Sequence, residues 1–113
     1  MKIILDAMGG DNAPQSTVKG AVCAKRELGV DIVLVGIEEQ IRECLKSEDC
    51  DGIEIVNATE IITMNDDPST ATRRKKDSSM AVALKMLSEG KGDAVVSAGS
   101  TGALLTGATL TVK

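Results

Sequence analysis

The sequence predicts an α/β fold: a doubly wound, three-layer arrangement in which a mostly parallel sheet lies between helices. Four short apolar runs alternate along the chain with longer segments whose apolar residues recur at helical spacing. The runs are almost continuously apolar, as in parallel strands that are buried on both faces. Ligands of such sheets bind beyond the carboxyl ends of the strands, so the loops at that edge are the first candidates for a site.

Each element has a local reason in the sequence. The strands are expected at the apolar runs, residues 3–5, 31–35, 53–56 and 94–96. A helix opens at Gln15 or Ser16 and stops at Gly29, because glycine favours the left-handed conformation at a helix end. A second, shorter helix is indicated by apolar residues at helical spacing, namely Ile37, Ile41, Cys44 and Leu45.

The second half of the chain is less regular between residues 60 and 79. Pro68 is suited to the first position of a helix, and residues 77–79 can cap the next helix. The apolar face of that helix is expected to hold Met80, Ala83, Leu84 and Leu87. The last apolar helical segment begins near Ala103 and the chain ends inside it, so we expect residues 1–113 to be the amino-terminal part of one larger α/β domain.

Composition excludes several classes of function. The 113 residues include no histidine, which excludes Ser-His and Cys-His nucleophilic pairs and histidine metal sites within this chain. They include no aromatic residue and carry a net charge of −4, which disfavours a nucleic-acid platform. No apolar run approaches the length of a membrane span, and the start, MKIILDAMGG, reaches a charge and glycines too soon to predict a signal peptide. A cytoplasmic location is therefore the default expectation.

The three cysteines give no sign of a disulfide or a metal site. The chain has an odd number of cysteines, namely Cys23, Cys44 and Cys50, and their spacing in the sequence is not that of metal ligands. Cys23 and Cys44 fall on apolar helix positions, so we expect both to be buried thiols.

The loop after the fourth strand is the first candidate anion site. Glycines let backbone N–H groups turn inward, hydroxyls add donors, and the first turn of the following helix leaves N–H groups unpaired. The candidate residues are Ser97, Gly99, Ser100, Thr101 and Gly102. The alternative is an ordinary strand-to-helix turn with a hydroxyl cap, and the pattern is neither the Rossmann nor the Walker motif.

The loop after the first strand is expected to lie at the same edge. Gly9 and Gly10 permit the close approach of a ligand. Asp6 and Asp11 either cap this loop, orient a hydrogen-bond donor, or bind a metal through their oxygens. Because a carboxylate repels phosphate, we expect these two residues to act behind the binding groups. That the two loops are neighbours in space is a hypothesis, since one sequence does not give the strand order.

A basic cluster, residues 73–76 (Arg-Arg-Lys-Lys), stands out in an otherwise acidic chain. The cluster is either a set of solvated charges or an anion-binding group. Ser78 and Ser79 follow directly at the start of a helix, which favours a second phosphate-binding corner.

Three segments together resemble a known family. They lie in order at residues 5–11, 74–80 and 95–103, with the sequences LDAMGGD, RKKDSSM and VVSAGSTGA. They resemble the bacterial acyl-acyl-carrier-protein:phosphate acyltransferases of phospholipid synthesis. The resemblance extends over essentially the whole chain, which corresponds to about the first third of a family member.

The resemblance implies transfer of a fatty acyl group from acyl-acyl-carrier-protein to inorganic phosphate, giving acyl phosphate, with no cofactor and no metal. It implies a fold similar to phosphate acetyltransferases and isocitrate-type dehydrogenases, and a homodimer with peripheral membrane contact. The remaining carboxyl-terminal portion is expected to supply the acyl tunnel and the dimer interface. The 113 residues alone are then expected to be inactive.

Site roles follow from the same resemblance. Lys76 and Ser100 are the candidate catalytic residues. Substrate and phosphate binding is assigned to Gly9, Gly10, Ser78, Ser79, Ser97, Gly99, Thr101 and Gly102. The other three basic residues, Arg73, Arg74 and Lys75, are expected to face the acidic carrier protein or lipid headgroups. Ser100 stands where the family usually has Asn, and serine has a shorter reach than an amide.

Two other functions stay open on the residues alone. One is a nucleotide-binding α/β enzyme that uses the same glycine loops, although it lacks the Rossmann and Walker patterns. The other is a non-catalytic fragment that only binds partners.

Overall fold

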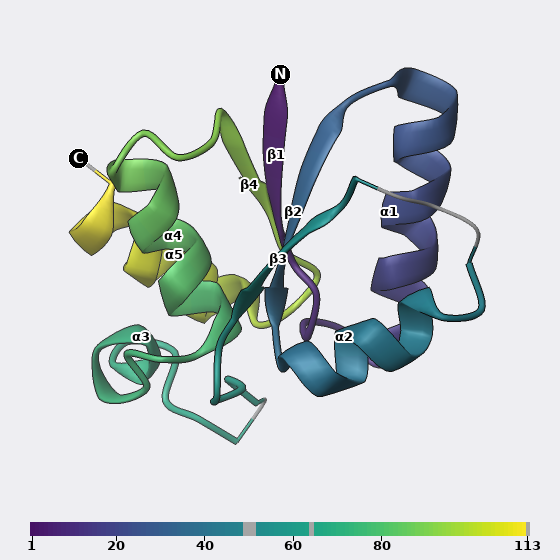
Figure 1. Ribbon diagram of the computed structural model, residues 1–113. Coiled ribbons are helices and arrows are strands. Elements are labelled where there is room, and N and C mark those ends of the chain that lie inside the picture. Colours follow the sequence, from purple (N-terminus) through teal and green to yellow (C-terminus); the bar gives the residue numbers. More distant parts are fainter. Residues whose placement is uncertain (49–51, 64, 113) are drawn as a thin grey trace.

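The computed structural model describes residues 1–48, 52–63 and 65–112, and it shows a parallel sheet with helices on both faces (Figure 1). In chain order the elements are β1 (Lys2–Asp6), α1 (Gln15–Leu28), β2 (Asp31–Gly36), α2 (Glu38–Leu45), β3 (Glu54–Asn57), α3 (Ala71–Arg74), α4 (Ser79–Ser88), β4 (Ala94–Val96) and α5 (Thr101–Thr111). The predicted α/β class and three-layer arrangement are confirmed.

The sheet places the first and the last strands side by side. Its order is β3-β2-β1-β4, and all three pairings are parallel. In the register, Ile4 lies opposite Val33 of β2 on one side and opposite Val95 of β4 on the other. The chain therefore adds β2 and β3 on one side of β1 and then β4 on the other. This reversal is a topological switch point, the place where open α/β sheets bind their ligands.

Alternate residues of the central strand β2 supply the two halves of the core. Ile32 and Leu34 belong to the apolar cluster that α1 and α2 cover, with Val18 of α1. Val33 and Val35 point to the opposite face and pack in the cluster that includes residues of α4. This two-residue alternation is that of a strand buried on both faces, which explains the continuous apolar run in the sequence.

Several expected element ends are found. Gly29 adopts a φ of 66° at the end of α1, and its N–H bonds to the carbonyl of Lys25. Ser78 caps α4, because its side chain accepts a hydrogen bond from the N–H of Ala81. Pro68 lies in the turn before α3 rather than in its first turn, since α3 begins only at Ala71.

Two expectations need correction. The last helix begins at Thr101 rather than near Ala103, because Ser100 caps it two residues earlier than the apolar pattern indicated. Cys23 is exposed, not buried. The buried face of α1 passes through Val22, and the next helical residue points about 100° away from it. Cys44 is half-buried, and Cys50 lies outside the described residues.

Apolar surface remains open on both sides of β4. One groove, of about 300 Å³, is lined by residues that include Leu5, Ala21 and Val96. The other, of about 450 Å³, lies between α4 and α5 and includes Val95 and Leu104. Within the described residues, β4 pairs with β1 alone. No described helix is long and apolar enough to cross a membrane.

Candidate functional site

The loops that follow β1 and β4 meet at the carboxyl edge of the sheet. The Ser97 hydroxyl donates to Oδ2 of Asp6 across 2.8 Å, although the two residues are 91 positions apart. Oδ1 of Asp6 accepts from the N–H of Met8 at 3.1 Å, and the Ser97 oxygen accepts from the N–H of Gly99 at 3.1 Å. The hypothesis that these loops are neighbours is confirmed, and Asp6, only 2% exposed, lies at their junction.

The two loops touch through glycine backbone. A Cβ added to Gly9 would lie 2.8 Å from the Gly99 nitrogen and 3.0 Å from Oδ2 of Asp6. No side chain fits at that distance from backbone, so residue 9 must be glycine for the loops to approach this closely. Gly10, with a φ of 104°, lies at the exposed outer part of the same loop, as does Asp11.

The start of α4 forms a third side of the site. A Cβ on Gly99 would lie 3.3 Å from Cε of Met80, so the first turn of α4 packs beside the glycine loop. Ser78 and Ser79 are both buried. Backbone hydrogen bonds hold this corner, from Ser79 N–H to the Glu60 carbonyl at 3.1 Å and from Glu60 N–H to the Asp77 carbonyl at 3.1 Å.

The start of α5 offers unpaired donors. The Ser100 oxygen accepts from the N–H of Ala103 at 3.3 Å, and the Ser100 carbonyl accepts from Leu104 at 3.0 Å. The N–H groups of Thr101 and Gly102 have no acceptor in the part of the chain that the structure describes. They point along the positive end of the dipole of an eleven-residue helix, which favours an anion there.

Gly102 also has a packing role. A Cβ at this position would lie 2.7 Å from Cβ of Pro68. The second glycine of the loop motif therefore lets the turn before α3 approach the first turn of α5. Neither this contact nor the one between Met80 and Gly99 is readable from local sequence, because each joins segments distant in the chain.

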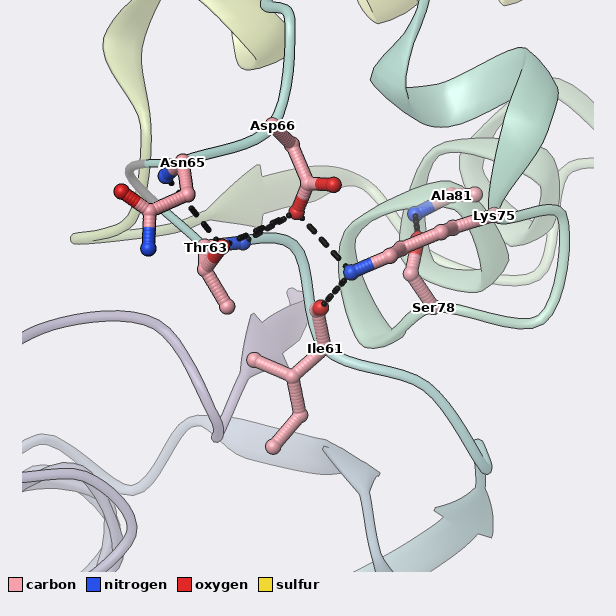
Figure 2. A network of polar contacts seen from close by, with 7 residues as sticks. All are labelled: Ile61, Thr63, Asn65, Asp66, Lys75, Ser78 and Ala81. Atoms are coloured by element: carbon pink, nitrogen blue, oxygen red, sulfur yellow. Dashed lines mark hydrogen bonds and ion pairs between the residues drawn. The ribbon is translucent and has the colours of Figure 1, made fainter.

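Within the basic cluster, Lys75 faces inward (Figure 2). Its ammonium donates to the Ile61 carbonyl at 2.8 Å and lies 2.9 Å from Oδ2 of Asp66. The same carboxylate accepts from the backbone N–H of Thr63 at 2.7 Å. The Thr63 hydrogen bond, and after it the one from Lys75, hold the pKa of Asp66 below its usual value. We expected Lys75 to face a partner. The structure shows instead that its ammonium binds the loop before α3.

The other three basic residues are exposed. Lys76 lines a groove of about 870 Å³ that runs along α4 and includes Val82 and Met86. No residue of the two glycine loops lines this groove. Arg73 and Arg74 line a separate shallow pocket with Asp67 and Thr70.

The chemistry of the site is that of hydrogen-bond donation to an anion. Backbone N–H groups and hydroxyls surround the meeting point of the loops, and the one buried carboxylate there, that of Asp6, already accepts two hydrogen bonds. Across residues 1–48, 52–63 and 65–112, no three or more Cys, Asp or Glu side chains gather as a metal site would require.

Comparison with known proteins gives a consistent family. The sequence model of the family described as "Fatty acid synthesis protein" matches residues 1–113. A phosphate acyltransferase of Clostridioides difficile (strain 630) is 51% identical, over 95% of this chain and 32% of the relative. The phosphate acyltransferase of Desulforamulus reducens is 52% identical over 91% of this chain and 31% of the relative. That of Pelobacter propionicus is 47% identical over 100% of this chain and 33% of the relative. The chain spans about a third of the length of these relatives.

Proposed function

The chain belongs to the fatty acid synthesis protein family, and on that premise we propose that the whole protein moves a fatty acyl group from acyl-acyl-carrier-protein to inorganic phosphate. The relatives are named phosphate acyltransferases, which supports an acyl transfer in which phosphate takes part. The observation that carries the proposal is the meeting of two glycine loops at the switch point of the sheet, beside unpaired helix N–H groups. Such donors suit a phosphate anion.

The proposed reaction needs no nucleophilic side chain. An oxygen of hydrogen phosphate attacks the thioester carbonyl, so that a C–O bond forms and the C–S bond breaks. The electron pair leaves with the sulfur, and the phosphate proton ends on the carrier thiol. Phosphate is a nucleophile at neutral pH, which agrees with a chain that has no histidine. Positioning the two reactants supplies roughly 7–11 kcal/mol, and each donor to the thioester oxygen about 3–4 kcal/mol.

Roles for the chain's own residues follow from the geometry. We assign phosphate binding to the first turn of α5, where Thr101 and Gly102 have free N–H groups, with Ser100 at the cap. Gly10 and the buried Ser79 border the same edge of the sheet. Lys76 is exposed beside Asp77, and we propose that it attracts the anionic substrate toward this edge.

The setting of the whole protein is part of the proposal. A cytoplasmic homodimer with peripheral membrane contact is what the family resemblance implies. The open apolar grooves beside β4 support a further protein surface over that edge, since exposed apolar patches of this kind are typical of interfaces.

The test uses the full-length protein. Purified protein, acyl-acyl-carrier-protein and labelled phosphate are expected to give one labelled acyl phosphate for each carrier thiol released. A folded full-length protein that makes no acyl phosphate would overturn the proposal. Equilibrium dialysis with labelled ATP and NAD tests the alternative, because tight binding of either nucleotide favours a nucleotide-dependent enzyme instead.

A further inference from the structure

Two hydrogen bonds to carboxylate side chains join the ends of β1 to the residues that flank β4, one at each edge of the sheet. At the amino edge, Oδ2 of Asp93 accepts from the N–H of Lys2 at 2.7 Å. At the carboxyl edge, Oδ2 of Asp6 accepts from the Ser97 hydroxyl at 2.8 Å. We call the second the Asp6–Ser97 link. Both hydrogen bonds join residues 91 positions apart, and both lie beside the pairing of β1 with β4. Only the Asp6–Ser97 link lies at the candidate site.

The hydroxyl of Ser97 is fully used inside the protein. A serine hydroxyl has one proton, and that of Ser97 is donated to Asp6. Its oxygen accepts from the N–H of Gly99 at 3.1 Å. In this arrangement Ser97 has no proton to donate to a phosphate oxygen, although its place in the loop motif predicts that role.

The carboxylate of Asp6 is an unusual choice for a simple structural contact. It is 2% exposed, and its partners are two neutral donors, the Met8 N–H and the Ser97 hydroxyl. Burying a carboxylate without a cation is costly unless it is well hydrogen-bonded. In return, a charged acceptor makes a shorter and stronger hydrogen bond than a neutral one.

The Asp6–Ser97 link acts together with the close approach of the two glycine loops. The backbones of Gly9 and Gly99 lie so close that a Cβ on Gly9 would be 2.8 Å from the Gly99 nitrogen, which leaves little room for the loops to approach further. The Asp6–Ser97 link prevents them from moving apart. Contact on one side and a charge-assisted hydrogen bond on the other define one spacing between the loop after β1 and the loop that begins α5.

We propose that Asp6 is a positioning residue, which acts through Ser97 to fix the spacing of the two glycine loops and so the position of the Thr101 and Gly102 N–H groups that receive phosphate. Ser97 is then part of this link and not a phosphate ligand. The inference rests on the proposed function for the identity of the anion, and it adds which residues place the donors.

Kinetics of the full-length protein test it with four variants: Asp6→Asn, Ser97→Ala, the double variant, and Ser97→Thr. Asparagine keeps the shape of Asp6 but removes the charge, and its amide donates to Ser97 instead of accepting from it. Since a misplacement of about 1 Å costs on the order of 100-fold, each single variant is expected to lower kcat/KM for phosphate roughly 10- to 100-fold. The KM for the acyl donor is expected to change less than about twofold, and Ser97→Thr, which keeps the hydroxyl, to restore most of the activity.

The double variant and a matched control decide between a shared and a separate role. Because both single changes remove the same charge-assisted hydrogen bond, the double variant is expected to be no less active than the less active of the two single variants. Asp93→Ala removes the acceptor of the hydrogen bond from Lys2 at the opposite edge, and its phosphate kinetics are expected to stay within about twofold of the wild type. Losses that multiply in the double variant, or an equal loss in Asp93→Ala, would overturn the proposal.

A binding measurement separates this inference from the proposed function. Phosphate titrated into the full-length wild type is expected to shift the amide NMR signals of Thr101 and Gly102, and the shifts are expected to be lost in Ser97→Ala but kept in Ser97→Thr. If the wild type shows these shifts but makes no acyl phosphate, the proposed function fails and the positioning role stands. If Ser97→Ala binds phosphate as the wild type does, the positioning role fails. The Ser97 pair gives the answer even where Asp6→Asn does not fold.

Discussion

The Lys75 ammonium lies 2.9 Å from the Asp66 carboxylate and at the same time donates to the carbonyl of Ile61. The pair is about three-quarters buried and closes the segment after β3 onto the segment before α4 (Figure 2). Lys75→Ala is expected to lower the melting temperature and to increase amide exchange around residue 61, because it removes both contacts. Lys91→Ala is the control, since Lys91 has an exposed pair with Glu89 at 3.5 Å and should leave the melting temperature almost unchanged. Equal effects of the two substitutions would contradict this account.

Acid is expected to destabilise the fold through three carboxylates. Hydrogen bonds from Thr63 to Asp66, from Ser69 to Asp67 and from Thr59 to Asp77 each lower the pKa of the accepting carboxyl below its ordinary value of 3.8. A lowered pKa in the folded state means that the stabilisation is complete above pH 3.8 and is lost as the pH falls through the lowered values. The urea midpoint measured by circular dichroism should therefore be lower at pH values below 3.8 than just above it. Asp77→Asn should make that decline shallower, and an unchanged decline would contradict the role of Asp77.

Gly9→Ala is expected to disrupt the meeting of the two loops. Its Cβ would lie 2.8 Å from the Gly99 backbone nitrogen, and backbone cannot move aside as a flexible side chain does. We expect a loss of about 1–3 kcal/mol in the free energy of unfolding, together with loss of phosphate-dependent activity in the full-length protein. Gly20→Ala is the matched control. Nothing lies within 4 Å of its Cβ position in α1, and removing a helix glycine should stabilise the protein by roughly 0.5–1 kcal/mol. A stable and active Gly9→Ala variant would contradict the close contact.

Substitutions of Ser100 distinguish a role in capping α5 from a role in contacting the substrate. Ser100→Ala removes the hydrogen bond to the Ala103 N–H and is expected to cost about 1 kcal/mol of stability. Ser100→Asn introduces the residue that the family resemblance leads us to expect at this position, and asparagine caps helices as well as serine does. The Asn variant is therefore expected to keep the stability of the wild type. A higher kcat in Ser100→Asn at unchanged stability would show a contact of residue 100 with the reacting groups, and an unchanged kcat would show capping alone.

Lys76 gives a prediction for substrate capture. In the full-length protein, Lys76→Ala is expected to raise the KM for phosphate much more than the KM for the acyl donor. Lys85→Ala is a suitable comparison, because Lys85 lines the same groove along α4. If the two substitutions raise the KM for phosphate equally, the effect comes from the charge of the groove as a whole. If Lys76→Ala changes neither KM, Lys76 does not take part in capture.

Local sequence was enough to predict the elements that depend on local physics. The apolar run of β2, the glycine end of α1 at Gly29 and the serine cap of α4 at Ser78 all follow from residues within a few positions of one another. The start of α5 was misplaced by two residues because small residues such as Thr101 and Gly102 fit a loop as well as a capped helical turn.

The rest depends on contacts between distant segments. The hydrogen bond of Asp6 to Ser97 requires β4 to lie beside β1, and strand order is not written in any local pattern. The inward direction of Lys75 depends on where the segment at Ile61 passes. The sequence therefore led us to expect Lys75 to face a partner together with Arg73 and Arg74, although its side chain is partly buried.

The strand order also sets the timing of biosynthesis. β1 occupies an inner position of the sheet, yet one of its two neighbours is β4, whose residues leave the ribosome about 90 positions later. At roughly 5–20 residues per second, β1 waits several seconds or more with one hydrogen-bonding side bare, a state that invites pairing with foreign chains. The edge that is proposed to hold phosphate is thus completed only when β4 docks beside β1, and the nascent chain has no anion pocket before that step.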